Sequence, residues 1–312
     1  MSKTVLTGIK PTGTLHIGNY FGAMKPAIET AGEHSYFFIA DYHALTTTQN
    51  AKEMAEQVKH IACAWLACGL HHGTAAFYRQ SDVPEIFELT TILNNVTAKG
   101  HMDRAHAYKD AKAKGKDVNM GLYNYPILMA ADILAFDTDI VPVGKDQQQH
   151  VEIASDIAKS FNAIFGNTLK IPQFAIKKDI GTIPGLDGQK MSKSYNNVIP
   201  LFGTEQELKK AVMRITTDST VPTIETHRDH AIYHIYRIVT GAELRTVTGW
   251  GDAKLQLLDV LETYLKDMRE KYNKYMNEEW YIAEQILTAG AEKARKKARE
   301  VLQRVRKAIG VS

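Results

Sequence analysis

The sequence contains few cysteines and no long apolar run, and each absence narrows the class of protein. Cys63 and Cys68 are its only cysteines. They lie five positions apart on an apolar stretch, so on a helix they would point to different faces and could not bind one metal ion together. No stretch approaches the roughly 18 apolar residues of a membrane span, and no leader sequence precedes the first predicted strand. We therefore expect a cytoplasmic protein without a membrane segment or a protein-bound metal.

A strong charge imbalance and a disorder-prone composition are also lacking. The net charge is +3, which does not by itself indicate a polyanionic partner. The apolar content of 44% and the charged content of 23% are those of an ordinary globular protein. A length of 312 residues suggests one large domain and a smaller one, because single cores stop growing near roughly 250–300 residues.

Strand-like and helical patterns alternate in the first part of the chain. Apolar runs at residues 5–9, 36–40, 75–78 and 139–143 predict strands, and the patterns at residues 52–68, 84–95 and 125–134 predict helices. This order favours an α/β fold with a Rossmann-like, doubly wound parallel sheet over residues 1–200. Residues 101–117 have few bulky aliphatic side chains and predict a mobile surface segment. Residues 201–312 predict a helical domain, with helices at 255–265 and 280–287 and turns at 249–251 and Gly290.

Two glycine-containing segments far apart in the chain indicate an ATP site. The first, Pro11-Thr12-Gly13-Thr14-Leu15-His16-Ile17-Gly18-Asn19, lies between a predicted strand and a predicted helix. Such a turn directs backbone N–H groups toward one point, where phosphate can bind. The second, Lys190-Met191-Ser192-Lys193-Ser194, follows a loop bounded by Gly185 and Gly188 and can close over phosphates.

This pair of segments resembles the HIGH and KMSKS signatures of class I aminoacyl-tRNA synthetases. The second signature is present letter for letter, whereas Asn19 stands where the first ends in histidine. The resemblance implies that His16, Asn19, Lys190 and Lys193 are catalytic, with the lysines neutralising charge on the leaving pyrophosphate. It also implies that ATP arrives with Mg²⁺.

A third constellation lies on the predicted helix at residues 125–134. Tyr125, Met129 and Asp132 are spaced by four and three, so they share one face, against which a flat aromatic ligand could lie. Asp132 is a carboxylate in an apolar setting, which is costly unless a group donates to it or it reaches the surface.

The run Met129-Ala130-Ala131-Asp132 is similar to the one with which tryptophanyl-tRNA synthetases hold the indole ring. Gly144-Lys145-Asp146-Gln147-Gln148-Gln149-His150 resembles the family's Gly-x-Asp-Gln-x-x-His pattern, and residues 36–43 and 141–143 resemble strands at its pocket. The resemblance implies that L-tryptophan is bound by Leu6, Gly8, His43, Tyr125, Met129, Asp132, Val141, Val143 and Gln147. For ATP it implies Lys10, Thr12, Gly18, Asn19, Lys109, Lys112, Gly144, Asp146, Gln147, Ile183, Lys190, Met191, Lys193 and Ser194.

Two basic clusters and the size of the chain suggest further partners. Positive residues gather at residues 99–116 and 293–307, where they fit contact with phosphates or a solvated helix face. The family resemblance implies tRNA(Trp) as a partner, with the anticodon region bound by residues 201–312, and a homodimer. Three alternatives stay open at this point: a tyrosyl-tRNA synthetase, a small-molecule nucleotidyltransferase, and a non-catalytic binding protein related to the synthetases.

Overall fold

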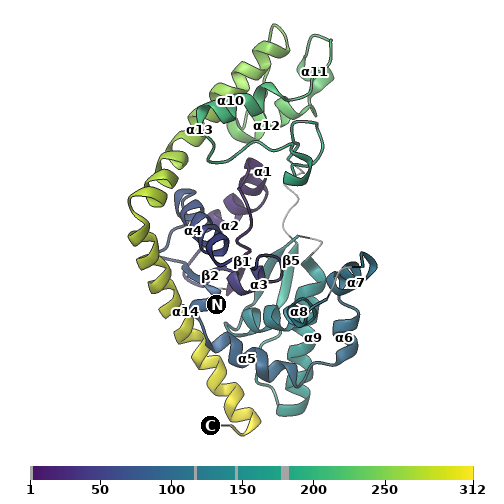
Figure 1. The fold of residues 1–312 in the computed structure, drawn as a ribbon, viewed down its shortest axis with the longest axis vertical. Coiled ribbons are helices and arrows are strands. Elements are labelled where there is room, and N and C mark those ends of the chain that lie inside the picture. The colour runs from purple at the N-terminus through teal and green to yellow at the C-terminus, as the bar shows by residue number, and fades with distance from the viewer. Residues whose placement is uncertain (1–2, 116–117, 145–146, 177–182, 312) are drawn as a thin grey trace.

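The computed structural model describes residues 3–115, 118–144, 147–176 and 183–311. In these residues five parallel strands form one sheet in the order β3-β2-β1-β4-β5. The strands are β1 (Val5–Ile9), β2 (Ser35–Ile39), β3 (Ala76–Arg79), β4 (Ile140–Val143) and β5 (Gln173–Ile176). The sheet with its surrounding helices confirms the predicted α/β class (Figure 1).

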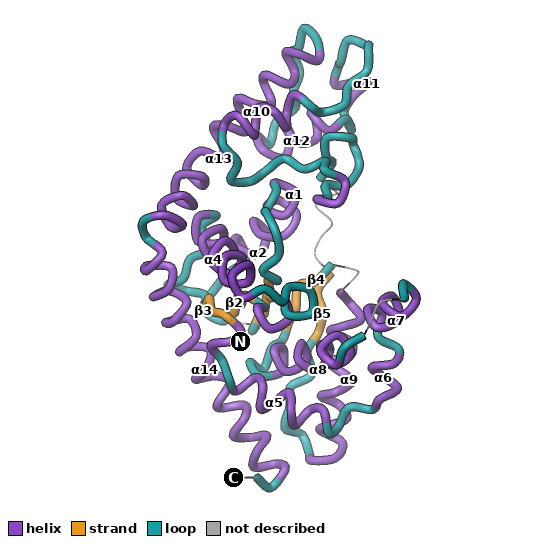
Figure 2. Tube along the Cα trace, viewed as in Figure 1, coloured by secondary structure: helices purple, strands orange, loops and turns teal. Residues whose placement is uncertain are grey.

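Helices connect the strands and form the rest of the described chain (Figure 2). In the α/β part they are α1 (Ile17–Asn19), the π-helix η1 (Tyr20–Met24), α2 (Lys25–Glu29), α3 (Asp41–Ala44), α4 (Ala51–Ala67), the 3-10 turn η2 (Gln80–Asp82), α5 (Glu85–Asn94), α6 (Lys99–Asp103), α7 (His106–Ala113), α8 (Met120–Leu134), α9 (Gln148–Phe165) and the 3-10 turn η4 (Lys193–Tyr195). Beyond them lie α10 (Glu205–Met213), α11 (Ile224–His227), α12 (Ala231–Thr240), α13 (Trp250–Asn277) and α14 (Trp280–Ile309).

One prediction about local structure is wrong and another gains detail. The segment at residues 101–117, predicted as a mobile surface segment, contains the end of α6 and all of α7, and its mobility stays a prediction. Met102, Ala105 and Ala111 are buried, so one methionine and two alanines pack these otherwise polar helices against the rest of the chain. Gly290 does not form a turn, because α14 continues through it as one helix of 30 residues.

The two faces of the sheet bury different sets of side chains, as the period of two along a strand requires. Phe37 and Ile39 of β2 belong to one core, which α4, α12 and α13 complete. Tyr36 and Phe38 belong to the other, which includes residues of α5, α8, α9 and the second half of α14. Because both faces are covered by helices, the strands are almost continuously apolar, and this made most of them visible in the sequence.

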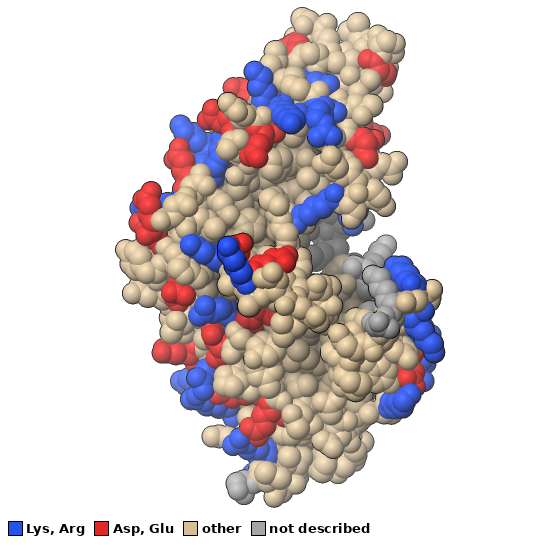
Figure 3. Space-filling view, viewed as in Figure 1, with Lys and Arg blue, Asp and Glu red and all other residues tan. Residues whose placement is uncertain are grey.

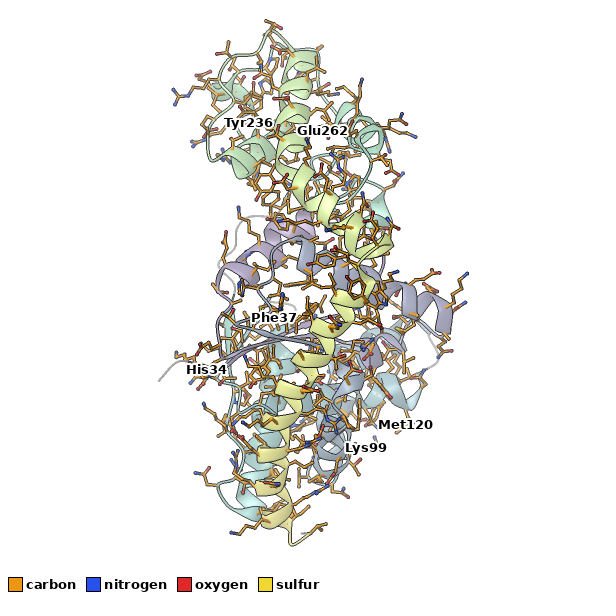
Figure 4. All side chains as sticks on the ribbon, turned by 90° about the vertical axis from the view of Figure 1, so that its left-hand side faces the viewer. His34, Phe37, Lys99, Met120, Tyr236 and Glu262 are labelled. Atoms are coloured by element: carbon orange, nitrogen blue, oxygen red, sulfur yellow. The ribbon has the colours of Figure 1, made fainter. Side chains whose placement is uncertain are left out.

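The C-terminal helices extend over the whole molecule. The chain from α10 to α12 lies at one end, α13 runs back from there, and α14 continues to the opposite end (Figure 1). Figure 4, viewed from the side of α14, shows this helix passing in front of the sheet that carries Phe37. Gly290 packs so closely on β3 that an added Cβ would lie 1.9 Å from the Phe77 carbonyl oxygen. The second half of α14 therefore covers the β3 side of the sheet, whereas a domain boundary at residue 200 stays a prediction.

Candidate active site

Two cavities meet at the carboxyl end of β1. The first, here called the loop cavity, has a volume of about 490 Å³ and is lined by residues of the 11–19 segment and of the 190–194 segment. The second, here called the helix cavity, has a volume of about 520 Å³ and lies between β1, β4, α3 and α8. Thr7, Gly8 and Lys10 line both. A ligand in each cavity would therefore approach the other beside β1, at the strand ends where parallel sheets commonly bind ligands.

The turn after β1 is held rigid by reciprocal hydrogen bonds. His16 caps α1: its Nδ1 accepts from the Asn19 N–H at 3.3 Å, and Asn19 Oδ1 accepts from the His16 N–H at 3.1 Å. The asparagine that departs from the family signature thus fixes the histidine of the same signature. Because Nδ1 accepts, the proton of neutral His16 is on Nε2, where it is available to a ligand.

The same turn is tied to the chain that follows the lysine-rich segment. The Ile17 N–H donates to the Ile199 carbonyl at 3.0 Å, and the Leu201 N–H donates to the Leu15 carbonyl at 3.1 Å. The two sequence signatures are thereby parts of one site. Gly18 is also required here, because a Cβ would lie 2.9 Å from His16 Nδ1 and 3.3 Å from Met191 Cβ.

Asn197 organises the segment that carries the two lysines. This side chain is 2% exposed. Its Oδ1 accepts from the Ser192 N–H at 2.7 Å, and its Nδ2 donates to Asp187 Oδ1 at 2.7 Å and to the Lys190 carbonyl at 3.1 Å. Met191 is buried as an apolar anchor. Sequence reasoning missed Asn197; the one signal for it was an asparagine shortly after a glycine-bounded loop.

The loop cavity contains cationic and N–H groups that can bind an anion. Lys193 Nζ donates to the Thr12 carbonyl at 3.3 Å, and partial burial lowers the pKa of this ammonium group. Burial and the neighbouring Lys193 lower the pKa of His16 to about 4, so its imidazole is neutral at neutral pH. Among the described residues that line this cavity there is no carboxylate. A phosphate group would meet cations and N–H donors.

The helix cavity has apolar walls and a small number of polar groups. Leu6, Val141 and Val143 of the strands face Met129 of α8 across it. Gly8 lies so close to Phe38 that a Cβ would be 2.8 Å from the ring. These walls suit a flat aromatic ring.

Asp132 is the buried polar group of the helix cavity, with 1% of its side chain exposed. Burial raises the pKa of its carboxyl, and hydrogen bonds from His43 and Gln80 act in the opposite direction. His43 Nε2 lies 2.8 Å from Oδ2, and Gln80 Nε2 lies 2.9 Å from both carboxyl oxygens. Donors from α3 and η2 therefore offset part of the cost of burying this carboxylate. Gln80 was not predicted; its signal was a polar residue directly after a strand.

A second polar group lies at the other end of the cavity. Tyr125 OH is 2.5 Å from His150 Nε2, and His150 Nδ1 is 2.8 Å from Gln147 Oε1. This row of contacts orients the phenol and the amide of two residues that line the cavity. The described part of the Gly-x-Asp-Gln-x-x-His pattern thus contributes Gly144 and Gln147 to the wall, and His150 contacts Gln147 and Tyr125.

The structure brings together all nine residues predicted for tryptophan, since each lines the helix cavity. For the nucleotide, His16 and part of the predicted set line the loop cavity: Lys10, Thr12, Asn19, Met191, Lys193 and Ser194. Other predicted residues do not line either cavity: Gly18, Lys109, Lys112, Ile183 and Lys190. Ile183 belongs to the apolar core, and its carbonyl accepts from the Met191 N–H. Asp146 lies outside the described residues.

Comparison with known proteins agrees with this geometry. The family model described as tRNA synthetases class I (W and Y) matches residues 2–304. A tryptophan–tRNA ligase of Bordetella parapertussis is 46% identical over 334 residues, covering 100% of this chain and 74% of the relative. A crystal structure of tryptophanyl-tRNA synthetase from Campylobacter jejuni superposes with a TM-score of 0.92 at 41% identity, covering 99% of this chain and 100% of that one. Another from the same organism, complexed with ADP and tryptophan, gives 0.90 at 42% identity, covering 98% and 99%.

The fold and the joined cavities define a class I aminoacyl-tRNA synthetase, and the chain belongs to that family by its match over nearly its whole length. Tyrosyl-tRNA synthetase from Archaeoglobus fulgidus shares the fold at 19% identity, with a TM-score of 0.65. The relatives with 42–46% identity are tryptophan–tRNA ligases. Within the family the chain therefore belongs to the tryptophan–tRNA ligases, as the sequence predicted, and the tyrosine alternative is not favoured.

Proposed function

We propose that the chain activates L-tryptophan with ATP to form tryptophanyl-adenylate and pyrophosphate, and then transfers the tryptophanyl group to tRNA(Trp). The observation that carries this proposal is the meeting of the two cavities beside Thr7, Gly8 and Lys10. Tryptophan in the helix cavity would place its carboxylate there, and ATP in the loop cavity would place its α-phosphate there. Holding both reactants in contact supplies much of the rate acceleration of such a reaction.

In the helix cavity, the indole ring lies between the strand valines and Met129. Its N–H donates to the Asp132 carboxylate, whose other hydrogen bonds come from His43 and Gln80. The α-amine lies toward Tyr125 and Gln147, which are oriented through His150. A buried acceptor of this kind favours a ring with an N–H over rings that lack one.

In the loop cavity, the phosphates of ATP lie against the His16 turn and the Lys193 segment. The tryptophan carboxylate oxygen attacks the α-phosphorus, and the bond from phosphorus to the pyrophosphate oxygen breaks. His16 donates its Nε2–H to a phosphoryl oxygen, and Lys193 exchanges the Thr12 carbonyl for the departing pyrophosphate. Mg²⁺ would arrive with ATP as part of the substrate and would neutralise charge on its phosphates.

We assign tRNA binding to the helical part of the chain. Some of the Lys and Arg side chains there pair with carboxylates of the α/β part. In α14, Arg295 and Arg299 both pair with Glu85, and Lys297 pairs with Asp137. These three cations hold α14 to the α/β part, whereas contact of the 293–307 cluster with tRNA phosphates stays a prediction. Lys and Arg side chains also gather over α7 and over the α10–α12 end (Figure 3). We assign tRNA phosphates to these surfaces and retain a homodimer in the cytoplasm as part of the proposal.

None of the helices in the described part of the chain is long and apolar enough to cross a membrane.

The proposed activity is tested by exchange of labelled pyrophosphate into ATP with each of the twenty amino acids. Tryptophan alone should support exchange, and Asp132→Ala should lower kcat/KM for tryptophan while narrowing its advantage over phenylalanine. Preference of the parent for tyrosine, or full discrimination by the variant, would refute the assignment of the helix cavity.

A further inference from the structure

Gln80 lies behind the helix cavity, where none of its atoms lines the wall, yet it makes the most extensive contact with Asp132. Its side chain is fully buried, and its Nε2 is 2.9 Å from each carboxyl oxygen. The amide nitrogen must face the carboxyl, because the amide oxygen at that distance would place two acceptors together. Gln80 thus supplies a two-point donor to a carboxylate that has little contact with water.

The other donor to Asp132 is anchored to the same turn. His43 belongs to α3, which begins at Asp41. Asp41 accepts from the Ser81 N–H at 3.1 Å and from the Ser81 hydroxyl at 2.5 Å. Because Ser81 follows Gln80 in η2, the two donors to Asp132 come from elements that hydrogen-bond to each other. The carboxyl is therefore held from two sides by one connected unit.

This arrangement leaves a defined direction for a ligand. His43 and Gln80 both contact Oδ2, whereas Oδ1 receives only the Gln80 contact from the described residues. A carboxylate oxygen can accept about two hydrogen bonds, so Oδ1 retains capacity for a donor in the helix cavity, which Asp132 lines. Rotation of the carboxyl would break the paired contact to Gln80.

We propose that Gln80 is a positioning residue for tryptophan selection: its amide keeps the Asp132 carboxyl turned so that Oδ1 accepts the ring N–H. The inference rests on the proposed function, since it requires tryptophan in the helix cavity. Gln80 itself does not touch the substrate. Its loss should lower the preference for a ring that donates, with little effect on rings that do not.

The electrostatics of the cluster agree with this role. Of the titratable groups on neighbouring elements, His43 of α3 hydrogen-bonds to Asp132. The buried Tyr78 phenol of β3 makes no hydrogen bond in the described structure; burial and the charge of Asp132 raise its pKa, but it does not contribute to the pKa of Asp132. Burial raises the pKa of Asp132, and the hydrogen bonds from His43 and Gln80 lower it. Removing the Gln80 amide removes one of the lowering contributions. The pKa of Asp132 should then rise, so the variant should lose its preference for tryptophan at a higher pH than the parent does.

The test compares tryptophan with 3-benzothienyl-alanine, in which sulfur replaces the ring N–H, in pyrophosphate exchange. The full chain is used as the parent, as Gln80→Met and as Tyr78→Phe. Methionine keeps the length of glutamine but has no donor. Tyr78→Phe is the matched control, because this buried hydroxyl has no hydrogen-bond partner in the described structure. The ratio of kcat/KM for the two substrates, measured in one preparation, does not depend on the fraction of folded enzyme.

We expect the parent to favour tryptophan by roughly 10²- to 10⁴-fold and Gln80→Met to lose about ten- to a hundredfold of that ratio, mostly through tryptophan. The loss should be larger at pH 6 than at pH 8, and Tyr78→Phe should keep the parental ratio. A Gln80→Met ratio within threefold of the parent at both pH values would overturn the inference, as would an equal loss for both substrates. A parent that uses the two substrates equally would show that Asp132 does not accept the ring N–H, and the proposed binding mode would fail with it.

Discussion

Replacing Gly290 by alanine sets two physical effects against each other. The residue lies inside α14, where glycine is worse than alanine by about 1 kcal/mol per residue in a helix interior. Judged by helix propensity alone, Gly290→Ala should stabilise the protein. The structure predicts the reverse, because α14 packs on β3 at this position.

The contact distances decide which effect is larger. An added Cβ at residue 290 would lie 1.9 Å from the Phe77 carbonyl oxygen and 2.6–2.7 Å from the Phe77 carbonyl carbon and amide nitrogen. These are backbone atoms of a buried strand, so they cannot rotate away as a side chain would. Overpacking of a well-packed core typically costs about 1–3 kcal/mol, and here a helix must move from a strand. Because backbone atoms must move, we expect a cost at the upper end of this range, about 3 kcal/mol, which the helix-propensity gain of about 1 kcal/mol reduces to a net loss of about 2 kcal/mol in the free energy of unfolding.

The measurement is urea unfolding of the parent and of Gly290→Ala, followed by circular dichroism. Gly251→Ala is the matched control: Gly251 lies in the first turn of α13, and no neighbouring atom lies within 4 Å of the position that an added Cβ would take. The control should unfold at an equal or slightly higher urea concentration, whereas Gly290→Ala should unfold at a clearly lower one. Equal or greater stability of Gly290→Ala would refute the packing argument.

Three further predictions concern charge. Lys193→Ala should slow single-turnover adenylate formation by two to three decades, the effect of about 2.7–4 kcal/mol in transition-state stabilisation, with tryptophan binding nearly intact; a rate within twofold of the parent would contradict the role. His16 has a pKa of about 4 in the folded chain, below its ordinary 6.5, so the unfolded chain binds more protons between these values. Stability should therefore fall from pH 6.5 to pH 4, and His16→Gln should flatten that slope in urea unfolding; an unchanged slope would argue against it. Glu85→Gln should destabilise by about 1–2 kcal/mol, because Glu85 accepts from Arg295 and Arg299, and a thermal shift equal to that of an exposed Glu→Gln control would disprove this.

Much of the fold could be predicted because burial on both faces of the sheet makes the strands apolar throughout. The predicted strands at 5–9, 36–40, 75–78 and 139–143 coincide with β1–β4 to within one residue. Strand β5 was not predicted. It is a short edge strand in which Gln173 and Phe174 are exposed, so its apolar pattern is weak. Helix α7 was missed for a related reason, since its polar composition gives little periodic signal.

Some residues of the candidate site could be predicted from the sequence and others could not. Residues that occur in contiguous motifs, such as His16, Lys193 and Asp132, could be identified from their neighbours in the chain. Gln80 and Asn197 could not, because their importance depends on where the fold puts them. Gln80 meets Asp132 across 52 positions, and nothing in residues 75–85 specifies that contact. Sequence patterns thus predicted the groups proposed to touch substrate better than the groups that hold them.

The hydrogen bonds around the loop cavity also bear on how Lys193 can act. The two ends of the loop that carries residues 190–194 are joined by a hydrogen bond: the Leu186 N–H donates to the Asn197 carbonyl at 2.9 Å. Just beyond, Ile199 and Leu201 are bonded to the His16 turn. Lys193 therefore projects from a segment whose end is fixed to the same turn that it faces, and its present partner, the Thr12 carbonyl, belongs to that turn. We expect Lys193 to exchange this neutral acceptor for a pyrophosphate oxygen, because a charged acceptor binds an ammonium group more strongly than a carbonyl does.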